Sequence, residues 1–198
     1  MPIDSQLAEL LEDLYARGRE HDAHQIDRLH RLRNVEPDTA RLLAVLIRAL
    51  APRRLLELGT SNGYSTIWLA DAARAVGGSL TSVEIDPARA AQARENLQRA
   101  GLDEVVELRV GDGGSVLAAS ADSEWNFIFL DAERPAYAGY WLDLVRVLAP
   151  RGLLAVDNVI SHAEELAKFR KLVANEKRVT DALVPSGAGA LLVVRETS

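Results

Sequence analysis

The sequence predicts an α/β fold: a seven-stranded, mostly parallel sheet with helices on both faces and additional helices at the N-terminus. From residue 53 onward, short apolar runs alternate with helical patterns. Such alternation is typical of parallel strands, because a parallel crossover is long enough to hold a helix. The runs expected to form parallel strands are 53–58, 79–85, 105–110, 125–130 and 152–156, with helices at 87–100 and 136–148.

The end of the chain departs from this alternation. Two more strand-like runs, 178–184 and 190–195, are separated only by residues 185–189. A connection this short joins antiparallel strands, so the last strand is expected to run opposite to the others. A doubly wound sheet closed by such a hairpin is similar to the Rossmann-like fold of class I methyltransferases.

The N-terminal part is predicted to be helical. A second helix is expected to begin at Pro37, which suits the first helical turn, and to end before Pro52. We expect residues 1–198 to form one domain, with 1–33 as a helical lid or dimerisation segment, because a lone sheet domain has no obvious place for its leucine-rich face. The apolar residues on this face are Ile3, Leu7, Leu10, Leu11 and Leu14.

The composition limits the partners. A formal net charge of −6 argues against nucleic-acid binding and fits a small neutral or cationic substrate better. No cysteine is present, which excludes disulfides and thiolate zinc sites. The N-terminus has no signal-like pattern, and no apolar run approaches a membrane span, so we expect a cytoplasmic protein without membrane contact.

The most informative segment is the turn that follows the first strand. Gly59 and Gly63 bracket it, and we interpret them as positions where the backbone approaches a ligand closely. Ser61 stands where a dinucleotide fingerprint would have a glycine against the pyrophosphate. Glu57 at the strand end suits a cationic ligand better than a phosphate. S-adenosylmethionine, with its ammonium and sulfonium groups, is such a ligand.

Every predicted parallel strand ends in polar or acidic residues. Ligands bind beyond the carboxyl ends of strands in open α/β sheets, so these ends are expected to form one rim. A carboxylate at Glu84 lies at a suitable spacing to accept hydrogen bonds from ribose hydroxyls. Each residue alone could be a helix cap or a loop residue, but the whole set favours a binding site. The other strand ends carry Glu57 and Gly59, residues 111–113, Asp131, and Asp157 with Asn158.

Asp131, Asp157 and Asn158 form a second candidate site. Their oxygen atoms on neighbouring strand ends would suit a hard cation such as Mg²⁺ or Ca²⁺. The alternative is that Asp131 caps a helix and that Asp157 and Asn158 form a turn. The spacing alone leaves both interpretations open.

These motifs together resemble the cation-dependent O-methyltransferases of the catechol and caffeoyl-coenzyme A type. The resemblance lies in residues 57–65, 83–87, 129–131 and 156–159. It implies that Asp131, Asp157 and Asn158 are metal ligands and that Glu84 binds ribose. The cofactor-binding residues that it implies are Val35, Glu57, Gly59, Ser61, Gly63, Tyr64, Ser65, Glu84, Ile85, Gly111, Asp112, Gly113 and Asp131.

One position departs from the family. The family usually has a lysine, its proposed general base, three residues after the first metal aspartate, and this sequence has Arg134. Arginine stays protonated, so Arg134 cannot remove a proton, although it can stabilise a phenolate. The alternative for Arg134 is a solvated or ion-paired loop residue. His162 is a second catalytic candidate, and its alternative is an ordinary first-turn residue of the next helix.

The leading hypothesis is an O-methyltransferase that uses S-adenosylmethionine, assisted by Mg²⁺ or Ca²⁺, and acts on a small catechol-like aromatic. The first alternative is a metal-independent methyltransferase for another small nucleophile, which Arg134 would favour. The second is a non-catalytic S-adenosylmethionine-binding module, and a dinucleotide oxidoreductase is disfavoured by Ser61. The resemblance also implies a homodimer.

Overall fold

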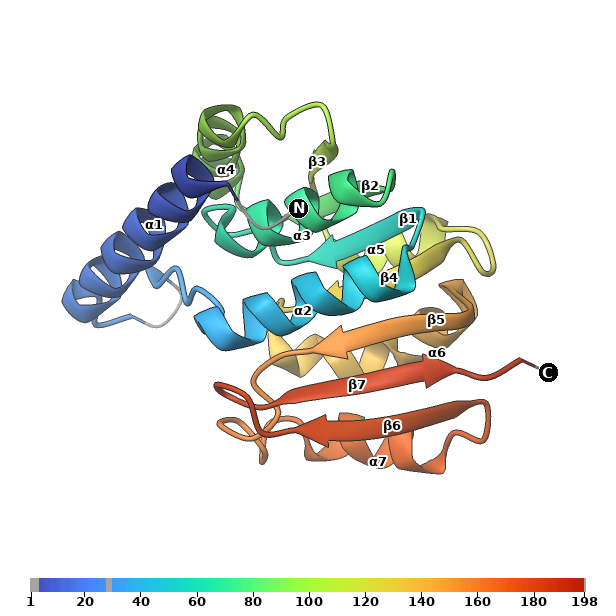
Figure 1. Ribbon diagram of the computed structural model, residues 1–198. Helices are drawn as coiled ribbons and strands as arrows, with labels where there is room; N and C mark the ends of the chain where they lie inside the picture. The colour runs from blue at the N-terminus through green and yellow to red at the C-terminus, as the bar shows by residue number, and fades with distance from the viewer. Residues whose placement is uncertain (1–3, 28–29, 198) are drawn as a thin grey trace.

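A computed structural model describes residues 4–27 and 30–197, and Figure 1 shows its single sheet with helices on both sides. The strand order is β3-β2-β1-β4-β5-β7-β6, with β7 antiparallel to both of its neighbours. The predicted fold class is therefore confirmed. The strands are β1 (Arg54–Leu58), β2 (Ser79–Glu84), β3 (Val106–Val110), β4 (Trp125–Leu130), β5 (Leu148–Val156), β6 (Val179–Val184) and β7 (Ala190–Arg195).

The helices form where the sequence supplies start and stop signals. The fourth helix begins with Pro87 after Asp86, whose carboxylate accepts a hydrogen bond from the Ala88 N–H, and ends at Gly101 in the left-handed conformation. The expected second helix has the predicted bounds. The helices are α1 (Ser5–His24), α2 (Pro37–Leu50), α3 (Tyr64–Ala75), α4 (Pro87–Ala100), α5 (Gly113–Ala119), α6 (Tyr137–Val147) and α7 (Ala167–Asn175), with a 3₁₀ turn η2 (Arg134–Ala136) before α6.

One element differs from the expectation. Helix α5 lies in an interval between predicted strands, and Asp112 caps it although its first residues, Gly113 and Gly114, have low helix propensity. Strand β5 begins at Leu148 rather than at 152, since the chain continues pairing with β4 across a register shift near Trp125.

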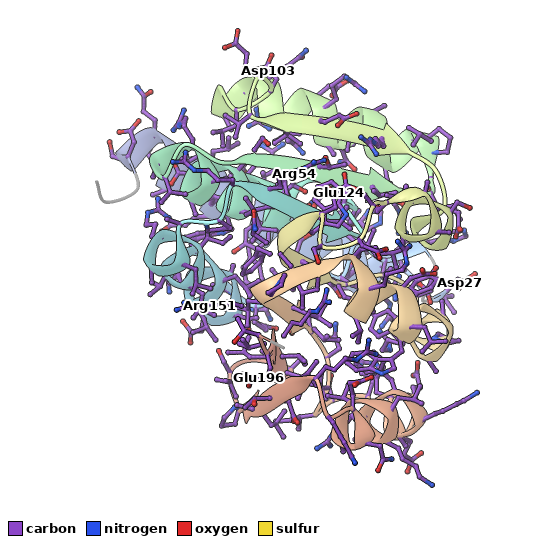
Figure 2. All side chains as sticks on the ribbon, turned by 90° about the vertical axis from the view of Figure 1, so that its right-hand side faces the viewer. Asp27, Arg54, Asp103, Glu124, Arg151 and Glu196 are labelled. Atoms are coloured by element: carbon purple, nitrogen blue, oxygen red, sulfur yellow. The ribbon has the colours of Figure 1, made fainter. Side chains whose placement is uncertain are left out.

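A separate apolar core lies on each face of the sheet. Alternate residues of one strand belong to different cores: Leu55 lies in the core that contains residues of α1, α2, α3 and α4, and Leu56 in the core that contains residues of α5, α6 and α7. Charged side chains lie at the amino ends of β1 and β4. Arg54 forms an ion pair with Glu124 and lies over the Trp125 ring, and Figure 2 shows the pair at the molecular surface. The open rim is the opposite one, at the carboxyl ends.

The leucine-rich face of α1 is packed inside the chain. Leu7, Leu11 and Leu14 are buried in the core that α2 and α3 share, so the interpretation that this face has no place on the domain is wrong. Ile3 lies outside the described residues. Figure 1 shows α1 beyond the carboxyl ends of the parallel strands. Among the described residues, no helix is both long and apolar enough to cross a membrane.

Candidate active site

A cavity of about 720 Å³, here called the main cavity, lies at the carboxyl ends of β1 to β5 and beneath α1. It brings together most of the residues that the sequence singled out. Glu57, Gly63 and Tyr64 are the exceptions and lie behind the wall of this cavity. The predicted residues that line it are Val35, Gly59, Ser61, Ser65, Glu84, Ile85, Gly111, Asp112, Gly113, Asp131, Arg134, Asp157, Asn158 and His162.

The two glycines of the turn are required by the packing of the chain itself. Gly59 has φ +104°, and a Cβ there would lie 2.1 Å from the Asp131 carbonyl oxygen. A Cβ on Gly63, which has φ +87°, would press on Ala93 of α4 at 3.2 Å. The packing of β4 and α4 thus requires both glycines, and Gly59 also lines the main cavity, so the close approach of this turn to a ligand stays a prediction.

Glu57 anchors this turn from below. Its side chain is fully buried, and its two oxygens accept hydrogen bonds of 2.6 Å from the hydroxyls of Ser65, Thr66 and Ser82. Burial raises the pKa of Glu57 to about 7, although the three hydroxyl donors oppose that shift. Glu57 thus ties the start of α3 to β2 and holds Ser65 at the cavity wall.

Glu84 is fixed by the backbone. Its carboxylate accepts hydrogen bonds from the Ser61 N–H at 2.7 Å and from the Asp86 N–H at 3.0 Å. The side chain is buried yet lines the cavity. Its remaining lone pairs can accept hydrogen bonds from a diol.

Asp112 caps a helix, which is the structural alternative for a strand-end residue. It caps α5, with its carboxylate accepting from the Ser115 N–H at 2.8 Å. It nevertheless lines the main cavity beside Gly111 and Gly113, so the cap and a binding role are compatible.

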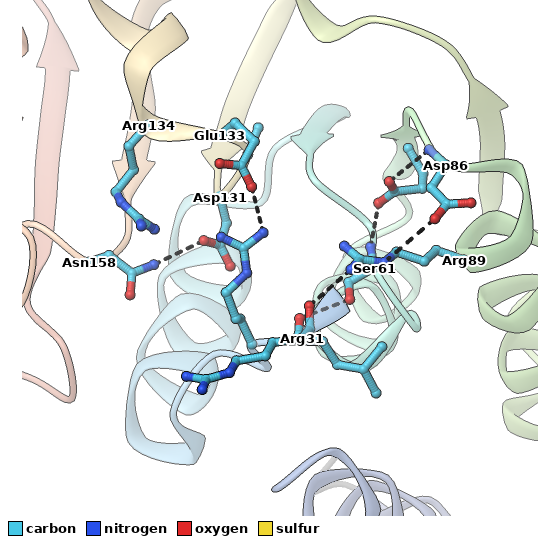
Figure 3. A network of polar contacts seen from close by, with 12 residues as sticks. Arg31, Ser61, Asp86, Arg89, Asp131, Glu133, Arg134 and Asn158 are labelled. Carbon is cyan, nitrogen blue, oxygen red and sulfur yellow. Dashed lines mark hydrogen bonds and ion pairs between the residues drawn. The ribbon is translucent and has the colours of Figure 1, made fainter. Parts of the chain in front are cut away.

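The metal-ligand candidates meet at the ends of β4 and β5. Asn158 donates a hydrogen bond of 3.0 Å from Nδ2 to the Asp131 carboxylate, as Figure 3 shows. Asp157 is 3% exposed, and its Oδ1 has no hydrogen-bond partner. Burial raises the pKa of Asp131 well above its usual range, and repulsion from Asp157 adds to the shift. The pKa of Asp157 rises to about 6, again chiefly through burial.

This set of donors fits a hard cation. The half-buried Asp131 and the buried Asp157 carboxylates repel each other, and a buried oxygen without a hydrogen-bond partner is costly unless a cation or a donor binds it. An amide rotation at Asn158 would add its oxygen to the two carboxylates. No cluster of three His, Cys, Asp or Glu side chains suited to a metal occurs in the described part of the chain, so a cation held here would need Asn158 as a third protein ligand.

Arg134 lies beside this group and is 4% exposed (Figure 3). Its Nε donates to Glu165 at 3.0 Å, while its buried Nη2 has no hydrogen-bond partner. Arg134 is therefore not solvated, but its contact with Glu165 agrees with the other half of its alternative, an ion-paired residue. Arg33 approaches from the N-terminal side and pairs with Glu133 at 2.6 Å. Both arginines hold the pKa of Asp131 down, against the effect of burial.

His162 lies in the turn between β5 and α7, five residues before that helix begins at Ala167. The alternative that it belongs to the first turn of the helix is therefore wrong. Its backbone N–H donates to the Asn158 carbonyl at 3.0 Å, and its ring Nδ1 is 2.8 Å from the Ser161 hydroxyl. The residue lines the main cavity.

Residues 31–36, here called the roof segment, were missed by sequence reasoning apart from Val35. The Asp22 carboxylate on α1 accepts hydrogen bonds from the N–H groups of Leu32 and Arg33, at 2.6 and 2.9 Å. From the opposite side, Ser61 Oγ donates to the Leu32 carbonyl at 2.9 Å, and Arg89 donates to the Arg31 carbonyl at 3.0 Å (Figure 3). No local sequence pattern indicated these contacts, because only the packing of α1 brings Asp22 close to Leu32 and Arg33.

The comparisons with known proteins agree with this geometry. The model of a family described as O-methyltransferase matches residues 3–196. The chain belongs to that O-methyltransferase family. It is 36% identical over 136 residues to the catechol O-methyltransferase of Niastella koreensis, covering 67% of this chain and 61% of that protein. It is 37% identical over 134 residues to the catechol O-methyltransferase of Mycobacterium tuberculosis, covering 68% of this chain and 60% of that protein.

The alignments therefore span about three fifths of these curated relatives. Among solved structures, the O-methyltransferase from Bacillus cereus in complex with SAH superposes with a TM-score of 0.78 and 28% identity, covering 99% of this chain and 93% of that one. The family resemblance and the fold expected from the sequence are both confirmed.

In this member of the O-methyltransferase family a second, open pocket adjoins the main cavity. This outer pocket has a volume of about 500 Å³ and is lined by Tyr15, Glu36, Pro37, Asp38, Gly187 and Ala188. The Tyr15 hydroxyl donates to Glu36 at 2.6 Å. Burial and this contact raise the pKa of Tyr15 to about 12, so the phenol stays a donor at neutral pH.

Proposed function

We propose that the protein is an O-methyltransferase that uses S-adenosylmethionine and transfers its methyl group to a hydroxyl of a small catechol-like aromatic. A divalent cation, Mg²⁺ or Ca²⁺, assists the transfer. The observation that carries the proposal is the orphaned Asp157 Oδ1 beside Asp131, in the same cavity as a Glu84 carboxylate fixed by two backbone N–H groups. The family membership and the SAH-bound relative support it.

Different residues along the main cavity would bind different parts of S-adenosylmethionine. Glu84 would accept hydrogen bonds from the two ribose hydroxyls, with residues 111–113 beside the adenine. Ser61, Ser65 and Val35 would line the methionine part. Methyl transfer from a sulfonium is an in-line displacement, in which the acceptor oxygen forms a bond to the methyl carbon as the bond to sulfur breaks. The protein contributes mainly alignment and the exclusion of water.

The acceptor must first lose a proton. A phenol has a pKa of about 10, so ionising it near neutral pH costs roughly 4 kcal/mol. When bound, the cation would supply much of this by stabilising the phenolate. Asp131, Asp157 and Asn158 would hold it, and the fixed positive charge of Arg134 would add to the same field. His162 is the side chain that we assign to accept the proton.

Two alternatives remain distinct from this proposal. Arg134 places a permanent cation beside the carboxylates, which favours a metal-independent methyltransferase acting on another small nucleophile. A non-catalytic S-adenosylmethionine-binding module would use the Glu84 side of the cavity alone. The homodimer, the cytoplasmic location and the absence of nucleic-acid and membrane partners stay predictions.

The test measures binding and turnover separately. Calorimetry should show that S-adenosylmethionine binds with or without Mg²⁺, and that a catechol engages only when Mg²⁺ is present. The Asp157→Ala variant should lose turnover by at least about 100-fold while keeping cofactor affinity. Asp181→Ala, on the exposed face of β6, is the matched control.

Each contrary result points to one alternative. Equal loss of cofactor binding and turnover in Asp157→Ala would count against a metal role for this residue. Turnover that survives an excess of chelator would favour the metal-independent enzyme. Tight cofactor binding without turnover on a wide panel of acceptors would favour the binding module.

A further inference from the structure

We propose that Asp22, near the end of α1, is a positioning residue for the cofactor. Its carboxylate would hold the roof segment at the main cavity before the cofactor binds, and would thereby slow the dissociation of the cofactor. This inference rests on the S-adenosylmethionine part of the proposed function and adds to it the side chain that prepares the cofactor site.

The place of Asp22 in its helix is the first argument. It lies in the last turn of α1, where the helix carbonyls carry a partial negative charge. A carboxylate is unfavourable to the helix at this end and would be favourable at the other. The stability of α1 therefore gives no reason for an aspartate here, and the reason has to lie in what its side chain binds.

The contacts of the carboxylate are the second argument. Each oxygen accepts one backbone N–H, Oδ1 from Leu32 at 2.6 Å and Oδ2 from Arg33 at 2.9 Å. Arg33 has φ +53°, a left-handed conformation that a residue with a side chain keeps only when its surroundings hold it. Two N–H groups that converge on one carboxylate hold the backbone in this conformation.

Leu32 connects α1 to the strand side of the main cavity. Its N–H is bound by Asp22, and its carbonyl accepts the Ser61 hydroxyl at 2.9 Å (Figure 3). The Ser61 N–H donates in turn to Glu84 at 2.7 Å. All four residues line the main cavity. A side chain on α1 is thus linked, through one residue of the roof segment, to the carboxylate that is proposed to bind the ribose.

The expected physical effect is preorganisation. The whole roof segment lines the main cavity together with Ser61 and Glu84. A ligand that had to order this segment as it bound would lose part of its binding free energy to that ordering. If Asp22 holds the segment in advance, the cost falls on folding instead, and the bound cofactor keeps its contacts for longer. Asp22 should therefore act mainly on the dissociation rate.

A chase experiment tests the inference: radiolabelled S-adenosylmethionine is bound to the protein and displaced by an excess of the unlabelled compound. Asp22→Ala should raise the dissociation rate at least about tenfold and change the association rate by less than about threefold. Asp22→Asn, which keeps one acceptor oxygen, should fall between the parent and Asp22→Ala.

Asp13→Ala is the matched control. Asp13 is also an aspartate of α1, but its ion pairs are with Arg17 on the same helix at 2.8 Å and with Arg99 on α4 at 3.7 Å. Its removal therefore loosens α1 without removing a contact to the roof segment, and the dissociation rate should stay within about twofold of the parent.

A double-mutant cycle distinguishes positioning from direct contact with the cofactor. Ser61→Ala removes the hydroxyl that binds the carbonyl of Leu32. If Asp22 and Ser61 both act through Leu32, calorimetry with S-adenosylhomocysteine should show a combined loss of affinity smaller than the product of the two single losses. Losses that multiply would mean that Asp22 touches the cofactor itself, and would overturn the positioning role.

The outcomes separate the inference from the proposed function. An unchanged dissociation rate in Asp22→Ala, or an equal increase in Asp13→Ala, would overturn the inference and leave the methyltransferase in place. If Asp22→Ala does not fold, the same measurements on Asp22→Asn decide. A parent protein that binds the cofactor but methylates no catechol would refute the proposed reaction and leave this test unchanged. A parent protein that does not bind the cofactor would refute both.

Discussion

The two halves of the active-site region are built by different means. On the strand side, backbone groups fix the functional residues: Glu84 is held by two N–H donors, and Gly59 packs against the Asp131 carbonyl. On the helix side, α1 and the roof segment are joined to each other and to the sheet largely through side chains. The contacts of Tyr15 with Glu36 and of Arg33 with Glu133 join two side chains, whereas Asp22 holds the roof segment through two backbone N–H groups.

The two halves therefore differ in how well their contacts tolerate amino-acid substitution. A contact made by backbone atoms survives most substitutions around it, whereas a contact between two side chains is lost when either one changes. The strand side therefore suits a ligand that stays the same, as proposed for S-adenosylmethionine. The helix side can be altered with little cost to the fold, which suits the recognition of a particular acceptor.

The largest expected effect is at Gly59. Gly59→Ala would place a Cβ against the Asp131 carbonyl oxygen, at a φ of +104° that alanine rarely adopts. We expect a loss of at least about 3 kcal/mol in the free energy of unfolding. Urea denaturation measures it, and failure to fold is the extreme of the same result. Gly101→Ala is the matched control, since it has φ +62° with no atom within 4 Å and should cost about 1 kcal/mol.

A pH effect should follow from Glu57. Its pKa is raised to about 7 in the folded chain, so the folded state holds a proton that the unfolded state has released at the same pH. The free energy of unfolding should therefore fall between about pH 4.5 and pH 7, by up to about 3 kcal/mol from this group. Asp131 and Asp157 change stability in the same direction, because their pKa values are also raised.

Glu57→Gln tests this contribution. Urea denaturation from pH 4.5 to pH 8 should show a shallower fall in the variant than in the parent. Glu176→Gln is the opposite control, since Arg178 lowers the pKa of Glu176 to about 2 and its effect should be confined to acidic pH. Parallel slopes for Glu57→Gln and the parent would mean that Glu57 is ionised in the folded protein.

A smaller effect is expected on ligand binding at Glu84. Glu84→Gln removes the charge but keeps one carbonyl acceptor, so calorimetry should show S-adenosylhomocysteine binding weakened by about 30-fold. The KM of the catechol should change by less than about threefold, because the acceptor is proposed to bind near Asp131, Asp157 and Asn158 rather than at Glu84. Glu107→Gln, on the exposed part of β3, is the control. Equal losses for both ligands would show that the two halves are not independent.

The same division decides what the sequence could predict. Glu84, Asp131 and Asp157 follow apolar runs, and the sheet brings such ends together whatever the side-chain details. The local sequence did not indicate that Glu36 faces a pocket. It precedes Pro37 at a helix start, and an acidic residue is expected at such a position without any binding role. The position of the roof segment depends on how α1 packs across α3. This is a tertiary contact, and no periodic pattern in the sequence predicts it.

The smallest effect is expected at Arg33, and it tests whether the helix side is as replaceable as the comparison implies. Arg33→Gln removes an ion pair with Glu133 whose side chains are 29% and 44% exposed. Solvent screening limits such a pair, so the free energy of unfolding should fall by less than about 1 kcal/mol, and 1 M NaCl should reduce the difference. Arg41→Gln, which breaks the more exposed pair with Asp38, is the control. A loss above about 2 kcal/mol for Arg33→Gln would show that the roof segment is fixed as firmly as the strand ends. The specificity of the helix side would then depend on its rigidity rather than on side-chain contacts that can be replaced.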